Sequence, residues 1–268
     1  MRITGSNNSS GMSLGPKVGL VEIEGIIYDS KEAVNKLERL RKRDDINAIV
    51  IRVDSPGGTV APTQEIYTKV KKVNEEKPVI ISVGTVAASG GYYVALGGRK
   101  ILVNPGSIIG SIGVRFDYPV ATELMEKIGL QYQTFKSGDL KDAGSPTREV
   151  TDKDREFFES VIKDIQSQFV QALTENRNID LNELEMITDG RIFTGLQSVE
   201  LSLVDSIGTL EDAVSLAGVL GGIEGTPKLF EFEKKRPRLI DAIWGDIENK
   251  LNTKMQNLSA PLYLWRWE

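Results

Sequence analysis

The chain has 268 residues, of which 40% are hydrophobic and 26% charged, and its 33 basic and 38 acidic residues give a formal net charge of −5. This length and apolar content are enough for a substantial core, which excludes general disorder. The sequence contains no histidine and no cysteine, so Ser-His-Asp triads, Cys-His dyads, disulfides, thiolate zinc sites and iron–sulfur clusters are excluded. The acidic balance argues against a general nucleic-acid-binding protein.

The N-terminal segment, residues 1–17, has no apolar stretch of the kind found in signal peptides, and it is interpreted as a flexible lead-in. One uncharged stretch, residues 78–98, is long enough to span a bilayer. It contains five glycines, and its apolar run breaks after Val83. These features favour a short buried strand, a turn and a tightly packed helix over a membrane span.

Strand-like and helix-like segments alternate through the first half of the chain. Runs rich in β-branched or alternating apolar residues predict strands over 18–28, 46–53, 79–83, 100–103 and 131–135. Apolar residues at helical spacing predict helices over 31–43, over 62–76, after Ala87 and over 119–129. This alternation indicates an α/β fold with a largely parallel sheet, in which the nearly uncharged run 46–53 is a central strand.

The second half of the chain changes character at Thr151. An N-cap threonine, acids in the first turn and an apolar face that includes Phe158, Phe169 and Leu173 predict one long amphipathic helix over 151–176. Another helix is expected to open at Asp180.

The C-terminal tail, residues 226–268, has a composition of its own. A basic run over 234–238 precedes a helix-like stretch over 239–251. The tail is interpreted as a surface for a neighbouring subunit or for a membrane.

Two loops of small residues follow predicted strands, at the sheet edge where α/β proteins usually place their active sites. In the first loop, 54–58, Gly57 and Gly58 leave backbone amides open to a ligand, as an oxyanion hole requires. In the second, 87–93, Ser89 presents one hydroxyl among residues too small to cover it, next to Gly90. An ordinary Pro-Gly-Gly turn and a serine N-cap are the alternative interpretations.

A third loop, 136–146, supplies lysines. A serine nucleophile in a protein without histidine needs another base, and a desolvated lysine is the recognised substitute. Lys136 and Lys141 are both candidates for this base. Ser111, in the sequence Gly-Ser-Ile-Gly, is a candidate for holding the lysine amine in place, with a plain turn as the alternative.

Five motifs, in this order, resemble the signal peptide peptidase A family of serine proteases. They are Ser-Pro-Gly-Gly, Ala-Ser-Gly-Gly-Tyr-Tyr, Gly-Ser-Ile-Gly-Val, Ser-Gly-x-x-Lys-Asp-x-Gly-Ser-Pro and Gly-Arg-Ile-Phe-Thr-Gly-x-Gln, and the resemblance covers residues 18 to about 218. The resemblance implies a Clp-protease/crotonase-like fold of repeated β-β-α units, with a catalytic domain over 18–225 and helical elements for oligomerisation.

The same resemblance implies a Ser-Lys dyad that uses no metal or cofactor. Ser89 matches the family nucleophile, Lys141 the general base and Ser111 the residue that orients the lysine. Gly57 or Gly58, together with Gly90, matches the donors of the oxyanion hole. Lys136 does not match the family lysine.

The sequence departs from the family pattern in two places. The membrane anchor with which the family usually begins is not found here, and Ser202 stands where a glycine is common.

The function implied is an endopeptidase that cleaves leftover signal peptides or other unfolded apolar peptides. It is expected to work as a homo-oligomer at the cell membrane, with the catalytic domain on the extracytoplasmic side. Two alternatives are a crotonase-type acyl-CoA enzyme, which would use the glycine amides on an enolate oxygen, and a noncatalytic scaffold that binds membrane peptides. No nucleic-acid partner is expected.

Overall fold

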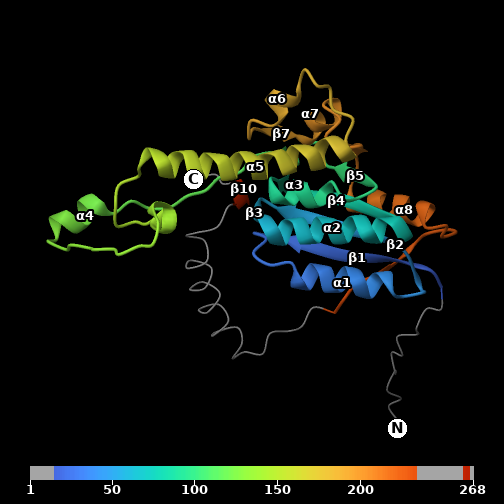
Figure 1. Ribbon diagram of the computed structural model, residues 1–268. Coiled ribbons are helices and arrows are strands. Elements are labelled where there is room, and N and C mark those ends of the chain that lie inside the picture. Colours follow the sequence, from blue (N-terminus) through green and yellow to red (C-terminus); the bar gives the residue numbers. More distant parts are fainter. Residues whose placement is uncertain (1–14, 234–261, 266–268) are drawn as a thin grey trace, which may run out of the picture.

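The computed structural model describes residues 15–233 and 262–265 (Figure 1). The strands are β1 (Lys17–Glu24), β2 (Ile46–Ser55), β3 (Gly57–Thr59), β4 (Val79–Ala88), β5 (Lys100–Val103), β6 (Ile108–Gly110), β7 (Ile192–Thr194), β8 (Ser206–Ile207), β9 (Lys228–Phe230) and β10 (Leu262–Leu264). The helices are α1 (Lys31–Arg41), α2 (Val60–Glu76), α3 (Gly90–Ala95), α4 (Thr122–Lys127), α5 (Asp152–Asn176), α6 (Leu184–Ile187), α7 (Gly195–Glu200) and α8 (Leu210–Leu220). A 3-10 turn spans Asp139–Asp142.

One mostly parallel sheet forms the centre of the molecule. Its strands follow the order β7-β6-β4-β2-β1-β9, while β5 also pairs with β4 and β8 with β5. Within this sheet only β6 and β7 are antiparallel. The predicted α/β class with a largely parallel sheet is confirmed.

Both faces of the central sheet are covered by helices. Val50 and Ile80 pack with Ala213 and Ala217 of α8 on one face. The opposite face carries Ile51 in the main core, which includes the buried apolar side chains of α1, α2 and α3. Burial on both faces agrees with the nearly uncharged run predicted for the central strand.

The uncharged stretch 78–98 forms strand β4 and helix α3, as its glycines predict. A side chain at Gly91 would lie 2.5 Å from the backbone oxygen of Ser55, so α3 packs directly against the end of β2. Across residues 15–233 and 262–265, no helix combines the length and apolar character that a membrane span requires.

The arm, residues 115–160, projects from one end of the sheet, with α4 at its far end (Figure 1). It consists of the segment 115–151 and the N-terminal part of α5. Phe158 of α5 stacks on Phe116 with the ring centroids 4.7 Å apart, and it also contacts Tyr118 at 5.4 Å. These aromatic contacts attach the segment to the helix.

Two predicted elements differ from the structure. The strand predicted over 131–135 is wrong: the segment has no ladder partner among the described residues, and Phe135 is 90% exposed. Its alternation of aromatic and polar residues lies on the arm, away from any sheet edge. The helix expected to open at Asp180 begins only at Leu184, after a turn.

The predicted C-terminal tail contributes to both sheets. β9 pairs with β1, and β10 forms a separate two-stranded sheet with β3. The helix-like stretch predicted over 239–251 lies outside the described residues.

Candidate active site

Ser89 is the single residue between strand β4 and helix α3. Its backbone has φ 50° and ψ −117°, a conformation that non-glycine residues rarely adopt, and the residue is 1% exposed. Its N–H donates to the Gly110 carbonyl at 2.7 Å, and its Oγ lies 3.5 Å from the Gly113 carbonyl oxygen. A strained serine on a sharp strand-to-helix turn is typical of a nucleophile elbow.

The three predicted oxyanion glycines lie together beside this turn. A Cβ on Gly90 would be 3.1 Å from the Gly58 nitrogen, and a Cβ on Gly57 would be 2.8 Å from the Gly90 nitrogen. Gly57 has φ 111°, and its N–H donates to the Ser55 Oγ at 3.1 Å. Because the loop itself engages the Gly57 amide, the geometry favours Gly58 of the two alternatives, together with Gly90.

Ser111 directly follows strand β6, which lies next to the elbow. β4 and β6 pair in parallel with Ala88 opposite Gly110, so Ser111 directly follows the residue that accepts the Ser89 N–H. Ser111 is 8% exposed and has φ 49°. The structure therefore brings Ser111 and Ser89 to neighbouring positions at the ends of two paired strands.

Lys141 is not part of this cluster within the single chain. It lies in the 3-10 turn on the arm, and its side chain is exposed. No hydrogen bond or ion pair connects Lys141 with Ser89 or Ser111 among the described residues. A base lysine is expected to be buried, but Lys141 is exposed because its turn lies on the projecting arm. No part of the chain that the structure describes covers its side chain.

Lys136, the rival base, is engaged in an ion pair. Its ammonium group donates to the Asp142 carboxylate at 2.8 Å and to the Asp139 carbonyl at 2.9 Å. Its ammonium group is therefore engaged within the arm, and among the described residues no hydrogen bond or ion pair connects Lys136 with Ser89.

A strand from the C-terminal region lies along the glycine loop, which the sequence analysis did not anticipate. Leu262–Leu264 pairs antiparallel with Gly57–Thr59, which places Tyr263 opposite Gly58. The Trp265 N–H donates to the Pro56 carbonyl at 2.8 Å. A Cβ on Gly57 would clash with the Tyr263 carbonyl oxygen while lying 2.8 Å from the Gly90 nitrogen. The Tyr263 carbonyl is therefore presented to the glycines beside Ser89.

The Tyr263 side chain fills an aromatic pocket next to the elbow. It is fully buried, with ring centroids 5.3 Å from Tyr93 of α3 and 4.8 Å from Phe169 of α5. Its hydroxyl donates to the Ile165 carbonyl at 3.1 Å, and burial raises the pKa of Tyr263 above the usual range. The pocket thus accepts a large neutral side chain and offers one acceptor at its end. The apolar face predicted for the helix over 151–176 includes Phe169, but the sequence pattern does not predict that this ring lines a pocket beside Ser89.

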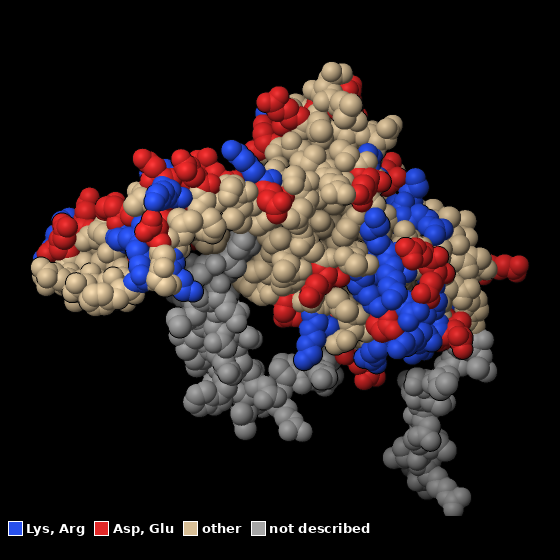
Figure 2. Space-filling view, viewed as in Figure 1, with Lys and Arg blue, Asp and Glu red and all other residues tan. Residues whose placement is uncertain are grey.

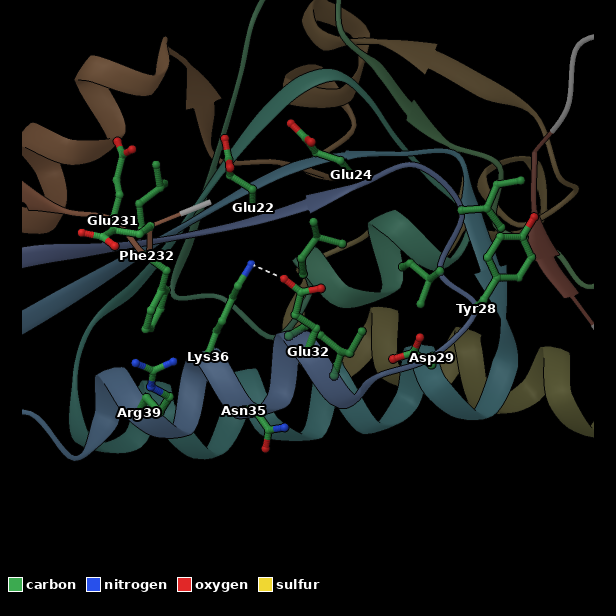
Figure 3. Close-up of a pocket in the computed structure, with 17 residues that line it drawn as sticks. Glu22, Glu24, Tyr28, Asp29, Glu32, Asn35, Lys36, Arg39, Glu231 and Phe232 are labelled. Atoms are coloured by element: carbon green, nitrogen blue, oxygen red, sulfur yellow. Dashed lines mark ion pairs between the residues drawn. The ribbon is translucent and has the colours of Figure 1, made fainter. Parts of the chain in front are cut away.

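A groove of about 950 Å³ lies elsewhere, between strand β1 and helix α1 (Figure 3). Its lining includes six acidic side chains, those of Glu22, Glu24, Asp29, Glu32, Glu231 and Glu233. Lys36 in the groove pairs with Glu32 at 2.6 Å. The groove contains none of the predicted catalytic residues. Ile27 connects it with the site, because it lines the groove and its N–H donates to the Gly57 carbonyl at 2.8 Å.

The chain is similar in sequence to known proteases. Residues 71–224 match the model of peptidase family S49, and residues 22–107 match that of Clp protease. A protein described as a protease from Synechocystis sp. is 38% identical over 244 residues, which cover 90% of this chain and 87% of that protein.

Two further relatives are longer than the matched region. A protein described as a protease from Methanocaldococcus jannaschii is 34% identical over 76% of this chain and 65% of its own length. A protein described as a signal peptide peptidase from Enterococcus faecium is 32% identical over 70% of this chain and 55% of its own length.

Proposed function

Because the chain belongs to peptidase family S49 and to its signal peptide peptidase A branch of serine proteases, we propose that it hydrolyses peptides with a Ser-Lys dyad formed by Ser89 and Lys141. The mostly parallel sheet and the Clp protease match confirm the predicted Clp-protease/crotonase-like fold. The proposal concerns the dyad, the substrates and the assembly.

The observation that carries the proposal is the strand β10 beside Ser89. An extended segment lies antiparallel to β3, its carbonyl at Tyr263 faces Gly58 and Gly90, and its side chain fills the aromatic pocket. Peptide recognition by strand addition works in this way, with main-chain hydrogen bonds for affinity and side-chain pockets for specificity. We infer that β10 occupies the place of a substrate with a large apolar or aromatic residue before the cleaved bond.

The chemistry follows from this placement. The Lys141 amine takes the proton of the Ser89 hydroxyl as Oγ attacks the peptide carbonyl carbon, and the N–H groups of Gly58 and Gly90 stabilise the resulting oxyanion. The C–N bond then breaks, and the leaving amine takes the proton from the lysine. Water, deprotonated by the same amine, hydrolyses the acyl-enzyme to a carboxylate and restores the serine hydroxyl.

The exposed position of Lys141 suggests how the dyad is completed. The arm carries exposed apolar side chains on α4 and on the segments on either side of it: Val120, Leu124, Ile128, Leu130, Tyr132 and Phe135. Figure 2 shows the arm as a projection with a broad uncharged surface between its charged groups. An apolar surface of this kind marks an interaction site. The arm of one copy is proposed to place its Lys141 at the Ser89 of a neighbouring copy, where the contact also supplies the desolvation that the base needs.

The substrate class is proposed from the family and from the pocket. Leftover signal peptides and other unfolded apolar peptides offer both the extended backbone and the large apolar side chains that the groove accepts. A relative from Enterococcus faecium is described as a signal peptide peptidase. We place the protein at the cell membrane, with its catalytic domain on the extracytoplasmic side, because signal peptides remain there after secretion.

The test of this function is covalent labelling of Ser89. A fluorophosphonate probe is expected to modify the protein at Ser89, identified by mass spectrometry, and to abolish cleavage of an unfolded apolar peptide. Ser89→Ala should remove both labelling and cleavage, whereas Ser160→Ala, at an exposed position on α5, should leave both intact. Peptide cleavage that survives Ser89→Ala would overturn the proposal. A protein that neither labels nor cleaves would favour the acyl-CoA enzyme or the scaffold.

A further inference from the structure

The start of α5 carries a carboxylate that is almost completely buried. The Asp154 side chain is 2% exposed and receives two hydrogen bonds from the Arg148 guanidinium, at 2.5 Å from Nη1 and 2.9 Å from Nη2. Asp154 also closes a capping box with Thr151, whose N–H donates to the carboxylate at 2.9 Å. These interactions hold the pKa of Asp154 well below its usual range.

The same guanidinium reaches the turn that carries Lys141. Arg148 Nη2 donates to Asp142 Oδ1 at 2.9 Å, and Asp142 is the neighbour of Lys141 in the 3-10 turn. Lys136 donates to the same oxygen at 2.8 Å. The Asp142 side chain is 14% exposed, and the two cations lower its pKa to about 2. The turn is therefore tied to the capped N-terminal end of α5 through one shared arginine.

The hydrogen bond from Arg148 to Asp142 is not required to cap the N-terminus of α5. The reciprocal bonds between Thr151 and Asp154 already form the capping box. Only arginine has a planar fork with enough donors to bind one carboxylate with two bonds and a second carboxylate with another, since a lysine is a point charge. The geometry thus joins the helix cap to the turn rather than stabilising the cap alone.

We propose that Arg148 is a positioning residue for the base Lys141, which it fixes by bridging Asp154 on α5 and Asp142 in the turn. Among the described residues, the Arg148 side chain bonds to Glu149, Asp154 and Asp142 and not to Ser89. This inference rests on the proposed function, because it assumes that Lys141 acts as the base. Because a base must be held in reach of the serine hydroxyl, a loosened turn slows the chemical step without changing the peptide groove at β3.

The decisive variant is Asp142→Asn, because it removes the charge that pairs with both Arg148 and Lys136 in the turn and leaves the Arg148–Asp154 pair and the cap intact. We expect kcat to fall roughly 10- to 100-fold, with KM for an unfolded peptide and the oligomeric state unchanged. KM and the oligomeric state report on the peptide groove and on the assembly, which this substitution leaves in place. A fall in kcat alone therefore reports on the position of Lys141 relative to Ser89.

Arg148→Gln should lose at least as much kcat as Asp142→Asn, and Arg148→Lys should recover part of the loss. The double variant Arg148→Gln/Asp142→Asn should lose far less than the two single losses combined, because both changes break the Arg148–Asp142 link, and Asp142→Asn adds only the loss of the ion pair with Lys136. Lys153→Gln is the matched control. It removes another ion pair to the same turn, between Lys153 and Asp139 at 2.8 Å. The side chains of both partners are more than 70% exposed. Because exposed ion pairs contribute little, kcat should change less than about threefold.

Lys141→Ala, measured in parallel, separates the two proposals. If Lys141→Ala retains full activity, the dyad itself is wrong, and the positioning role fails with it. If Lys141→Ala is inactive while Asp142→Asn keeps the kcat of the unmodified protein, the dyad stands and Arg148 serves only the fold. Should Arg148→Gln fail to fold, Asp142→Asn still decides, because the cap of α5 is untouched.

Discussion

Three serines carry the backbone strain of the described chain. Ser89, Ser111 and Ser202 have φ values of 50°, 49° and 58°, and no other non-glycine residue in the described ranges has a positive φ. Each such conformation costs on the order of 1–3 kcal/mol. Ser202 occupies the position where the family commonly has glycine, which has no such penalty. Ser89 and Ser111 follow paired residues of two strands, so their strain lies at the proposed site.

The proposed oxyanion hole leads to a first prediction, at Gly58. A Cβ at this position would clash with the backbone carbonyl of Ile27, so Gly58→Ala must shift the loop and misplace its amide. We expect kcat per titrated active site to fall roughly 100-fold or more. Gly106→Ala is the control, because a Cβ there meets nothing within 4 Å. A normal turnover per titrated site in Gly58→Ala, at any thermal stability, would remove this loop from the mechanism.

The second prediction concerns pH. A lysine base works only as the neutral amine, and lysine in water loses its proton near pH 10.4. The value of kcat/KM should therefore rise toward alkaline pH along a single limb. The chain contains no histidine, so no limb near pH 6.5 is expected. Rates measured between pH 6 and 10 check this, and a flat profile would contradict a rate-controlling lysine.

At the scale of elements, periodicity and β-branched runs predicted most of the core. The strand predicted over 100–103 coincides with β5, and the helix predicted over 151–176 coincides with α5 and its Thr151 cap. These elements depend on local pattern and burial, which a single sequence contains. The glycine-containing loops of the candidate site, which follow β2 and β4, were predictable because they directly follow strands that the local pattern identifies.

The strand predicted over 131–135 and the missed strand β10 show where local pattern fails. Alternation of apolar and polar residues leads to a strand only if the edge of a sheet is available for pairing. Residues 131–135 lie on the arm, where no described sheet edge is within reach, and they form no strand. Conversely, β10 is three residues long and is defined by its partner β3, more than 200 positions earlier. The aromatic pocket combines Tyr93, Phe169 and Tyr263, which are far apart in the sequence. No short stretch of the sequence contains all three residues, so local patterns could not predict the pocket.

A third prediction concerns β10 as an occupant of the peptide groove. If β10 lies where substrate binds, the two compete, and weakening β10 should lower the apparent KM for peptides. Tyr263→Ala removes the ring from the pocket and is expected to lower KM several-fold without lowering kcat. Phe232→Ala, in the groove beside β1, should leave KM unchanged. A raised KM in Tyr263→Ala would show that β10 supports the substrate site instead of covering it.

At the scale of the whole molecule, the body and the arm carry different halves of the proposed chemistry. Ser89 and Ser111 follow β4 and β6 of the central sheet and lie beside the glycines of β3, while Lys141 lies in the 3-10 turn at 139–142. The arm that carries this turn projects from the body in Figure 1. Exposed apolar side chains on the arm are unfavourable in water and are stabilised when another surface covers them. A closed ring of copies, each with its arm on the next body, would bury these side chains and complete each site.

The fourth prediction tests this assembly by complementation. Ser89→Ala and Lys141→Ala are each expected to be inactive. When the two chains are produced together, some sites combine an intact Ser89 from a Lys141→Ala chain with an intact Lys141 from a Ser89→Ala neighbour. For random assembly in equal amounts, about a quarter of the sites are then complete. If both residues came from one chain, no site would be complete, and the mixture would stay inactive.

Each variant produced alone gives the baseline for this experiment, and light scattering confirms that both still assemble. The double variant Ser89→Ala/Lys141→Ala, produced together with unmodified protein, is the matched control. In that mixture a site is active only where two unmodified chains adjoin, so again about a quarter of the sites are complete. If each chain held its own dyad, half would remain active. The two mixtures together therefore fix whether the arm delivers the lysine to its own body or to the next one.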